Sequence, residues 1–169
     1  MKHFILPLIL TLGFNSWSQN VNIPDPIFKQ YCLDNGAINT TPDSEISVEE
    51  ASTFSGTLDL EGLSISDLTG LEQFVALRYL RLSYTDVSSI DISANIALRT
   101  LSCEFLGLTE IDVSNNRDLS TLRCSNNNIS NFNASSNPNL TCIEVDDVAY
   151  STNNWMHIDN VASFSEACD

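Results

Sequence analysis

The sequence predicts a short, curved solenoid of parallel β-strands with about five coils and a helical cap at its N-terminal end. The prediction depends on a unit of 21 or 22 residues that recurs from Ser55 onward. Within each unit, apolar residues alternate over one short stretch, as they do in a strand with one buried face. Before the first unit, apolar residues fall instead at helical spacing, which indicates a separate helical element.

The repeated unit fixes the type of solenoid. Units begin at Leu77, Leu98, Leu119 and Leu140, and an earlier unit begins at Ser55. They share the pattern L-x-x-L-x-(L/C)-x-x-(N or other)-x-(L/I/V), which is the short leucine-rich repeat. One coil cannot bury its own leucines, so stacked coils form a continuous core and a parallel sheet. We therefore expect a leucine-rich-repeat solenoid over residues 55–148, with strands centred at Leu58–Leu60, Leu80–Leu82, Leu101–Cys103, Leu122–Cys124 and Ile143–Val145.

The open ends of such a stack need caps, because they would otherwise expose apolar side chains. Asp25 and Pro26 form a helix start signal, and a second helix is expected over Val48–Phe54 with Ser47 as N-cap and Glu50 three residues later. Residues 19–54 are therefore predicted to form an N-terminal helical cap. Residues 149–169, where the repeat pattern stops, are predicted to form a C-terminal cap.

The loop between the two predicted helices resembles a degenerate EF-hand calcium loop. Its spacing places oxygen donors at several EF-hand positions, although Ser44 replaces the usual glycine. We expect a loop that only caps the core and no cofactor, and the alternative that the resemblance implies is calcium binding. The candidate ligands are Asn39, Thr41, Asp43, Glu45, Ser47 and Glu50.

Cysteine positions indicate two different uses. A disulfide between Cys142 and Cys168 is expected to hold the C-terminal tail over the last coil. Cys103 and Cys124 occupy positions where other coils carry leucine, so they are expected to be buried thiols that act as small apolar groups. The state of Cys32 is left open.

Two sets of asparagines are candidates for structural roles. Asn127 occupies the position at which leucine-rich repeats hydrogen-bond backbone across coils. Asn95, Asn116 and Asn137 recur at another position, each two residues after a serine. We assign these serines and asparagines to turns, in which short polar side chains bond nearby backbone and asparagine tolerates left-handed geometry.

The N-terminus and the overall charge indicate an exported protein. Residues 1–18 have the basic start and short apolar run of a signal peptide. We expect a secreted or cell-surface protein, with the periplasm as the alternative, and no later segment is apolar enough to insert into a membrane. The formal net charge of −15 disfavours nucleic acid as a partner, because acidic proteins repel phosphate.

Several phrases resemble secreted leucine-rich-repeat proteins of the Bacteroidota, in the style of the internalin and BspA-like surface proteins. They are I-D-(I/V)-S-x-N at Ile90 and Ile111, L-x-x-L-x-C at Leu98 and Leu119, and the entry segment VNIPDPIFKQYCLDN from Val21. The resemblance implies adhesion or protein recognition, without a shared ligand.

The predicted function is non-catalytic binding of a protein or glycan outside the cell through the outward strand residues of the concave face. A calcium-dependent glycan- or surface-binding module is the first alternative, and a hydrolase using His157 is the second. Oppositely charged neighbours on the strands have a further interpretation, since they can simply stabilise the sheet. The candidate ligand-binding residues are Tyr79, Arg81, Ser102, Glu104, Arg123 and Glu144.

Overall fold

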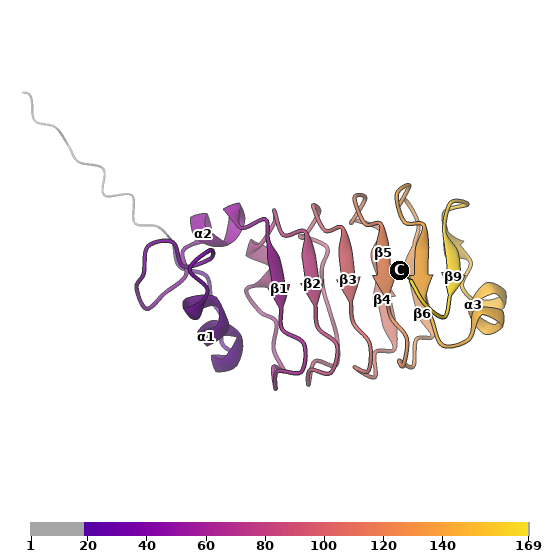
Figure 1. The fold of residues 1–169 in the computed structure, drawn as a ribbon, viewed down its shortest axis with the longest axis horizontal. Coiled ribbons are helices and arrows are strands. Elements are labelled where there is room, and N and C mark those ends of the chain that lie inside the picture. The colour runs from indigo at the N-terminus through magenta and orange to yellow at the C-terminus, as the bar shows by residue number, and fades with distance from the viewer. Residues whose placement is uncertain (1–18, 169) are drawn as a thin grey trace, which may run out of the picture.

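The computed structural model describes residues 19–168, which form a stack of coils with short helices at its two ends (Figure 1). The predicted signal peptide, residues 1–18, lies outside the described residues. One side of each coil contributes a strand to a six-stranded parallel sheet, whose order follows the chain. Its strands are β1 (Thr57–Asp59), β2 (Tyr79–Arg81), β3 (Thr100–Ser102), β5 (Thr121–Arg123), β7 (Cys142–Glu144) and β9 (Ser163–Ser165).

The strands stack in register, so equivalent residues of successive coils lie side by side. Leu80 of β2 pairs with Leu58 of β1 and Leu101 of β3, and this column continues through Leu122 and Ile143. All five side chains are fully buried. The leucine-rich-repeat solenoid predicted from the sequence is therefore confirmed, and its core is a set of apolar columns that run along the stack.

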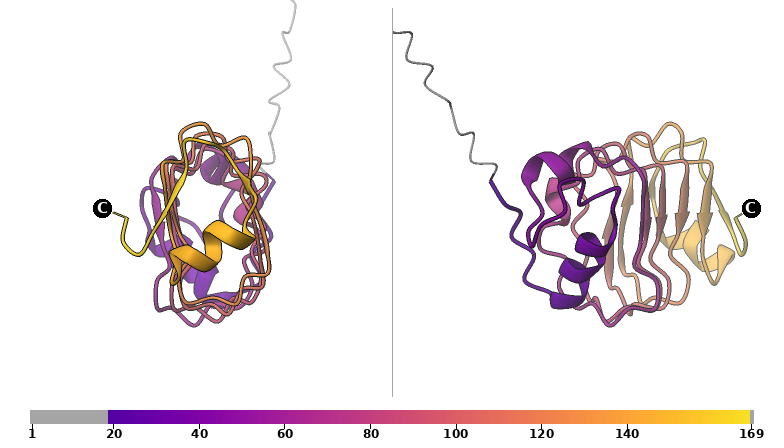
Figure 2. Two further views of the ribbon diagram at one scale, coloured as in Figure 1. Left: turned by 90° about the vertical axis from the view of Figure 1, so that its right-hand side faces the viewer. Right: turned by 60° about the vertical axis from the view of Figure 1, so that its left-hand side comes forward.

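The opposite side of the coils carries a smaller parallel sheet of three strands. These are β4 (Glu110–Asp112), β6 (Asn131–Ala134) and β8 (His157–Ile158), and the first coil has a 3-10 turn, η1 (Leu71–Gln73), on its return leg. Ile111 and Phe132 pair in this sheet and point into the core. The view along the stack shows the coils superimposed as a ring (Figure 2).

The tail differs from the prediction, in which the repeat stopped after Val148. Helix α3 (Val148–Asn154) crosses the C-terminal opening of the stack, and the chain then adds β8 and β9 to the two sheets (Figure 2). Phe164 of β9 pairs with Ile143, and Trp155 stacks on Phe132 with ring centroids 4.3 Å apart. The last coil is filled by aromatic rings instead of leucines, so it lacks the repeat signature.

The N-terminal cap contains the two predicted helices, α1 (Pro26–Asp34) and α2 (Val48–Thr53). Asp25 caps α1 by accepting from the N–H groups of Ile27 and Phe28, and it also accepts from the N–H of Ser66 in the first coil. Burial would raise the pKa of Asp25, but these backbone hydrogen bonds lower it. Tyr31 accepts from the N–H of Asp59, which satisfies a donor on edge strand β1.

The recurrent asparagines do more than form turns. Asn95, Asn116 and Asn137 are fully buried, and the Nδ2 group of Asn116 donates to the carbonyl oxygens of Ile92 and Asn95 in the preceding coil, each at 2.9 Å. Asn95 and Asn137 make the equivalent pairs of bonds. The turn interpretation is therefore wrong for the asparagines, because they form a buried ladder between coils. It holds for the serines, whose N–H groups donate to the side chain two residues earlier.

The thiols at leucine positions are buried as predicted. Cys103 and Cys124 are free, and each Sγ lies within hydrogen-bond distance of a carbonyl oxygen in the next coil. Burial raises the pKa of both thiols well above its usual value. Cys32 is also free and buried, and burial raises its pKa to about 12.

Within residues 19–168, no helix is long and apolar enough to cross a membrane.

The buried ladder predicts a specific cost of substitution. We expect Asn116→Ala to lower the free energy of unfolding by about 2 kcal/mol, because two buried hydrogen bonds between coils are lost and the carbonyl oxygens of Ile92 and Asn95 keep only a backbone donor in their own turn. Urea unfolding followed by circular dichroism measures the effect. Asn115→Ala is the matched control, since Asn115 is the exposed neighbour. Equal stability of the two variants would contradict a structural role for the ladder.

Candidate binding surface on the six-stranded sheet

The outward side chains of the six-stranded sheet form the candidate binding surface, here called the concave face. The row formed by the first residue of each strand is mostly short and polar, with Thr57 on β1, Thr100 on β3, Thr121 on β5 and Ser163 on β9. Tyr79 stands between Thr57 and Thr100 and is 40% exposed. This ring therefore rises above smaller neighbours on both sides.

Arg81 belongs to an ion-pair cluster at the N-terminal end of the face. Its guanidinium contacts Asp59 at 3.0 Å on the neighbouring strand and also pairs with Glu61 just beyond that strand. About half of the Arg81 side chain is exposed, so these pairs contribute little to stability. The pairing of Arg81 with Asp59 that the sequence suggested is therefore present, and whether the charges of the face serve binding or only the sheet stays open as two interpretations.

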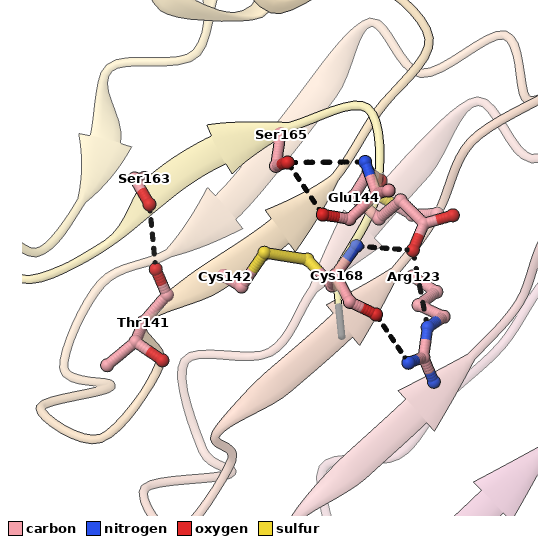
Figure 3. Close-up of a disulfide and its surroundings, with 9 residues drawn as sticks. Arg123, Thr141, Cys142, Glu144, Ser163, Ser165 and Cys168 are labelled. Carbon is pink, nitrogen blue, oxygen red and sulfur yellow. Dashed lines mark hydrogen bonds and ion pairs between the residues drawn. A yellow bond between two sulfur atoms is a disulfide. The ribbon is translucent and has the colours of Figure 1, made fainter.

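Arg123 and Glu144 hold the C-terminal end of the chain on the sheet (Figure 3). Arg123 donates to Glu144 at 3.2 Å and to the carbonyl oxygen of Cys168 at 2.7 Å. The N–H of Cys168 donates to the same Glu144 carboxylate at 3.1 Å. The predicted disulfide between Cys142 and Cys168 is confirmed, with the two Cα atoms 5.9 Å apart. Two candidate ligand-binding residues are thus engaged by the protein's own tail.

Glu104 and Ser102 lie near the centre of the face. Ser102 is buried, with 6% of its surface exposed, which leaves little of it for a ligand to contact. Glu104 is half-buried and accepts hydrogen bonds from the hydroxyls of Ser125 at 3.1 Å and Ser83 at 3.4 Å. The carboxylate therefore bridges three successive coils.

Two exposed aromatic residues border this centre and were not among the candidates from the sequence. Tyr84 and Phe105 follow β2 and β3, and their rings stack with centroids 4.5 Å apart and planes 15° from parallel. Both have positive φ angles, 63° and 58°. Alignment of the repeats could have identified them. The equivalent positions in the neighbouring coils hold Gly62 and Asn126, so two aromatic residues depart from the residue types that this position favours.

A pocket of about 390 Å³ lies at the C-terminal end of the stack. It is bounded by the turn Asn127–Ser130, by Asp146 and Asp147, and by Tyr150 and Trp155. Asn127 spans two coils, since its Oδ1 accepts from the N–H groups of Leu106 and Leu108. The bonds between coils predicted for Asn127 are therefore confirmed.

His157, the candidate for catalysis, is exposed on β8 in the smaller sheet, on the opposite side of the coils.

The EF-hand-like loop directs its oxygen atoms toward the protein's own donors. One oxygen of Glu50 accepts from the N–H and hydroxyl of Thr41, and the other accepts from the N–H and hydroxyl of Ser47. Asn39 contacts backbone atoms of Leu33 and Asp43. Glu45 lies apart from this cluster and pairs with Lys29 at 2.9 Å. A pocket of about 480 Å³, lined in part by Thr41, Asp43, Ser47 and Glu50, opens beside the loop.

These contacts make Glu50 the centre of the loop. Burial would raise the pKa of Glu50, but hydrogen bonds from Ser47 and Thr41 lower it to about 2. The same carboxylate completes a capping box at the start of α2, in which Ser47 and Glu50 satisfy each other's backbone N–H groups. Among residues 19–168, no group of three or more histidine, cysteine, aspartate or glutamate side chains is arranged to hold a metal ion.

The lowered pKa of Glu50 predicts a pH-dependent contribution to stability. At pH 7 we expect Glu50→Gln to reduce the free energy of unfolding by about 2 kcal/mol, because the amide cannot accept all the bonds of the carboxylate. Stabilisation by ionised Glu50 is complete above its unfolded-state pKa of about 4.3 and is lost as the pH falls through about 2. Urea unfolding at several pH values should therefore show the deficit narrowing over that window. Glu49→Gln, at an exposed position, is the control and should show no such dependence.

Calcium binding by this loop stays a prediction from the sequence, and the geometry suggests how to test it. Because Thr41 and Ser47 already occupy both oxygens of Glu50, we expect calcium to leave the midpoint of thermal unfolding unchanged relative to a chelator. Differential scanning calorimetry makes the comparison. A rise in the midpoint with calcium that disappears in Glu50→Gln would establish the site and contradict this expectation.

Comparison with known proteins identifies the repeat. The model of the family described as "Endo-beta-N-acetylglucosaminidase EndoS LRR domain" matches residues 44–153. No curated protein matches the sequence. The leucine-rich-repeat assignment made from the sequence is confirmed by this match.

Several solved structures are similar to the chain, and they include internalins from Listeria monocytogenes. The functional domain of InlJ, described as including a cysteine ladder, is 22% identical with a TM-score of 0.45, over 89% of this chain and 44% of that one. Internalin C2 is 10% identical with a TM-score of 0.43, over 84% of this chain and 86% of that one. This chain spans less than half the length of the InlJ domain.

The family match covers well over half of the sequence. The chain therefore belongs to the family of leucine-rich-repeat domains whose model is named after the EndoS LRR domain.

Proposed function

We propose that this chain is an exported, non-catalytic recognition module that binds a protein ligand through the concave face. The leucine-rich-repeat fold suggests a protein-interaction module, since its open sheet presents an extended surface. The disulfide between Cys142 and Cys168 is consistent with an extracellular, oxidising compartment. The family is named after the repeat domain of an endoglycosidase, in which the repeat is one part of the protein.

The observation that carries the proposal is Tyr79, an exposed ring on the second strand of the six, between two threonines on the neighbouring strands. Tyrosine is among the residues that contribute most to binding energy when a partner covers it. Six strands span about 24 Å. A surface of this width suits a loop or an extended segment of a partner better than a broad, flat interface.

The contacts also show which positions can test the proposal cleanly. Substitution of Arg123 or Glu144 would release the tail at Cys168 as well as alter the surface. Substitution of Arg81 would leave Asp59 and Glu61 close together without their cation. The side chain of Tyr79 forms no hydrogen bond with other residues in the range 19–168, so its substitution alters the surface without breaking such a contact.

Photo-crosslinking from the two sides of the stack tests the proposal. Benzoylphenylalanine replaces Tyr79 in one variant and Asn131 in the other, since Asn131 is exposed on β6 in the opposite sheet. Each full-length variant is irradiated with cell-surface and extracellular fractions, and adducts are identified by mass spectrometry. We expect one protein adduct from position 79 that excess unlabelled wild-type chain competes away and Tyr79→Ala does not.

The control position decides which surface binds. The same adduct from position 131 would place binding on the smaller sheet and contradict the proposal. Adducts that Tyr79→Ala competes away as well as the wild-type chain would show that the ring contributes nothing to recognition.

A further inference from the structure

The stacked pair Tyr84 and Phe105, here called the aromatic pair, is the most exposed aromatic cluster beside the concave face. Tyr84 is 56% exposed and Phe105 is 44% exposed. Tyr84 directly follows Ser83 in the sequence and Phe105 directly follows Glu104, and the Ser83 hydroxyl donates to the Glu104 carboxylate. The pair therefore starts from the backbone beside Glu104, whose carbonyl oxygen accepts from the N–H of Tyr84 at 3.2 Å.

Folding alone does not account for aromatic side chains at these positions. The backbone there is left-handed, and glycine and asparagine adopt that conformation at the least cost. The coils on either side use those residue types, Gly62 and Asn126, at the equivalent positions. Tyr84 and Phe105 carry the steric cost of a bulky side chain while leaving about half of each ring in water. Such outliers concentrate at functional sites.

The charges around the pair indicate what it binds. Arg81 and Arg123, the arginines of the concave face, are already engaged by acidic partners in the same sheet. The Glu104 carboxylate, in contrast, accepts hydrogen bonds only from the hydroxyls of Ser83 and Ser125, and within residues 19–168 it forms no ion pair. The chain as a whole carries a formal net charge of −15. A carboxylate without a cation next to exposed aromatic faces is complementary to a positively charged group.

We propose that the aromatic pair and Glu104 bind an arginine side chain in a basic segment of the protein ligand. A planar guanidinium stacks on an aromatic face and also donates parallel hydrogen bonds to a carboxylate, which a lysine ammonium cannot do in the same way. This inference rests on the proposed function, because it names the chemistry of the partner at one edge of the concave face.

A peptide titration tests the charge requirement. The probe is acetyl-Gly-Arg-Gly-Arg-Gly-amide, and the control peptide has citrulline, its neutral isostere, in place of each arginine. Nuclear magnetic resonance of the full chain at low salt follows the ring signals of Tyr84 and Phe105. We expect saturable shifts with the arginine peptide and an affinity at least about tenfold higher than for the citrulline peptide. Equal affinities for the two peptides would overturn the proposal.

Variants separate recognition from folding. The double variant Tyr84→Asn, Phe105→Asn copies Asn126 of the next coil, so it removes the rings and the backbone strain together. We expect it to keep its urea midpoint and to bind the arginine peptide at least about tenfold more weakly. Glu104→Gln should weaken binding similarly, and Tyr150→Asn, at an exposed ring on α3, should not. Unchanged affinity in the double variant would overturn the proposal.

Three further outcomes separate this inference from the proposed function and from a glycan partner. Binding of an N-acetylglucosamine oligomer that needs the aromatic pair, without binding of the arginine peptide, would replace the cationic partner by a glycan. Crosslinking from position 79 that persists in the double variant and in Glu104→Gln would overturn this inference while leaving concave-face recognition intact. Peptide binding that needs the pair, together with no crosslink from position 79, would support the pair and contradict the proposed function.

Discussion

Everything in this molecule depends on bonds between one coil and the next. A single coil of 21 residues has few contacts within itself, and the carbonyl oxygens at the corner of its return leg accept only one hydrogen bond from their own turn, as at Ile92 and Asn95. The amide of Asn116 meets two of them in the coil before, and Asn137 then meets the carbonyl of Asn116 itself. Asn95, Asn116 and Asn137 each link their coil to the one before it in this way. The strands of these coils stack in register, and their leucines lie side by side in the core.

The register has a direct consequence for the surface. Because equivalent positions form straight columns, a residue type that repeats in the sequence becomes a row on the protein, and a departure from the repeat becomes a local feature. Tyr79 interrupts a row of threonines, and Tyr84 and Phe105 interrupt a column that otherwise holds glycine and asparagine. The basic side chains on the same sheet are occupied by acidic neighbours. What the face offers to a partner is therefore aromatic and acidic.

The repeat made the fold predictable, and the same reasoning failed where structure depends on contacts between distant residues. Leucine spacing located the five predicted strands, and the Ser47 and Glu50 pair located the start of α2. The buried role of Asn116 could not be read from its neighbours, because its acceptors lie 24 and 21 residues earlier. The strand Ser163–Ser165 was missed because Phe164 and Trp155 fill a coil without leucines. On the surface, charge and spacing identified Arg123 and Glu144, but they could not show that the tail at Cys168 occupies both.

The disulfide at the end of the stack also determines how the protein behaves under tension. A covalent loop of 26 residues joins Cys142 to Cys168 and encloses α3, β8 and β9. A pull on the two chain termini cannot extend that loop, so about 90 Å of contour length stays hidden while the bond is intact. Only the coils before β7 and the N-terminal cap can be drawn out. If the protein is pulled from both ends, the residues of the last coil would thus stay within a closed covalent loop after the other coils had been extended.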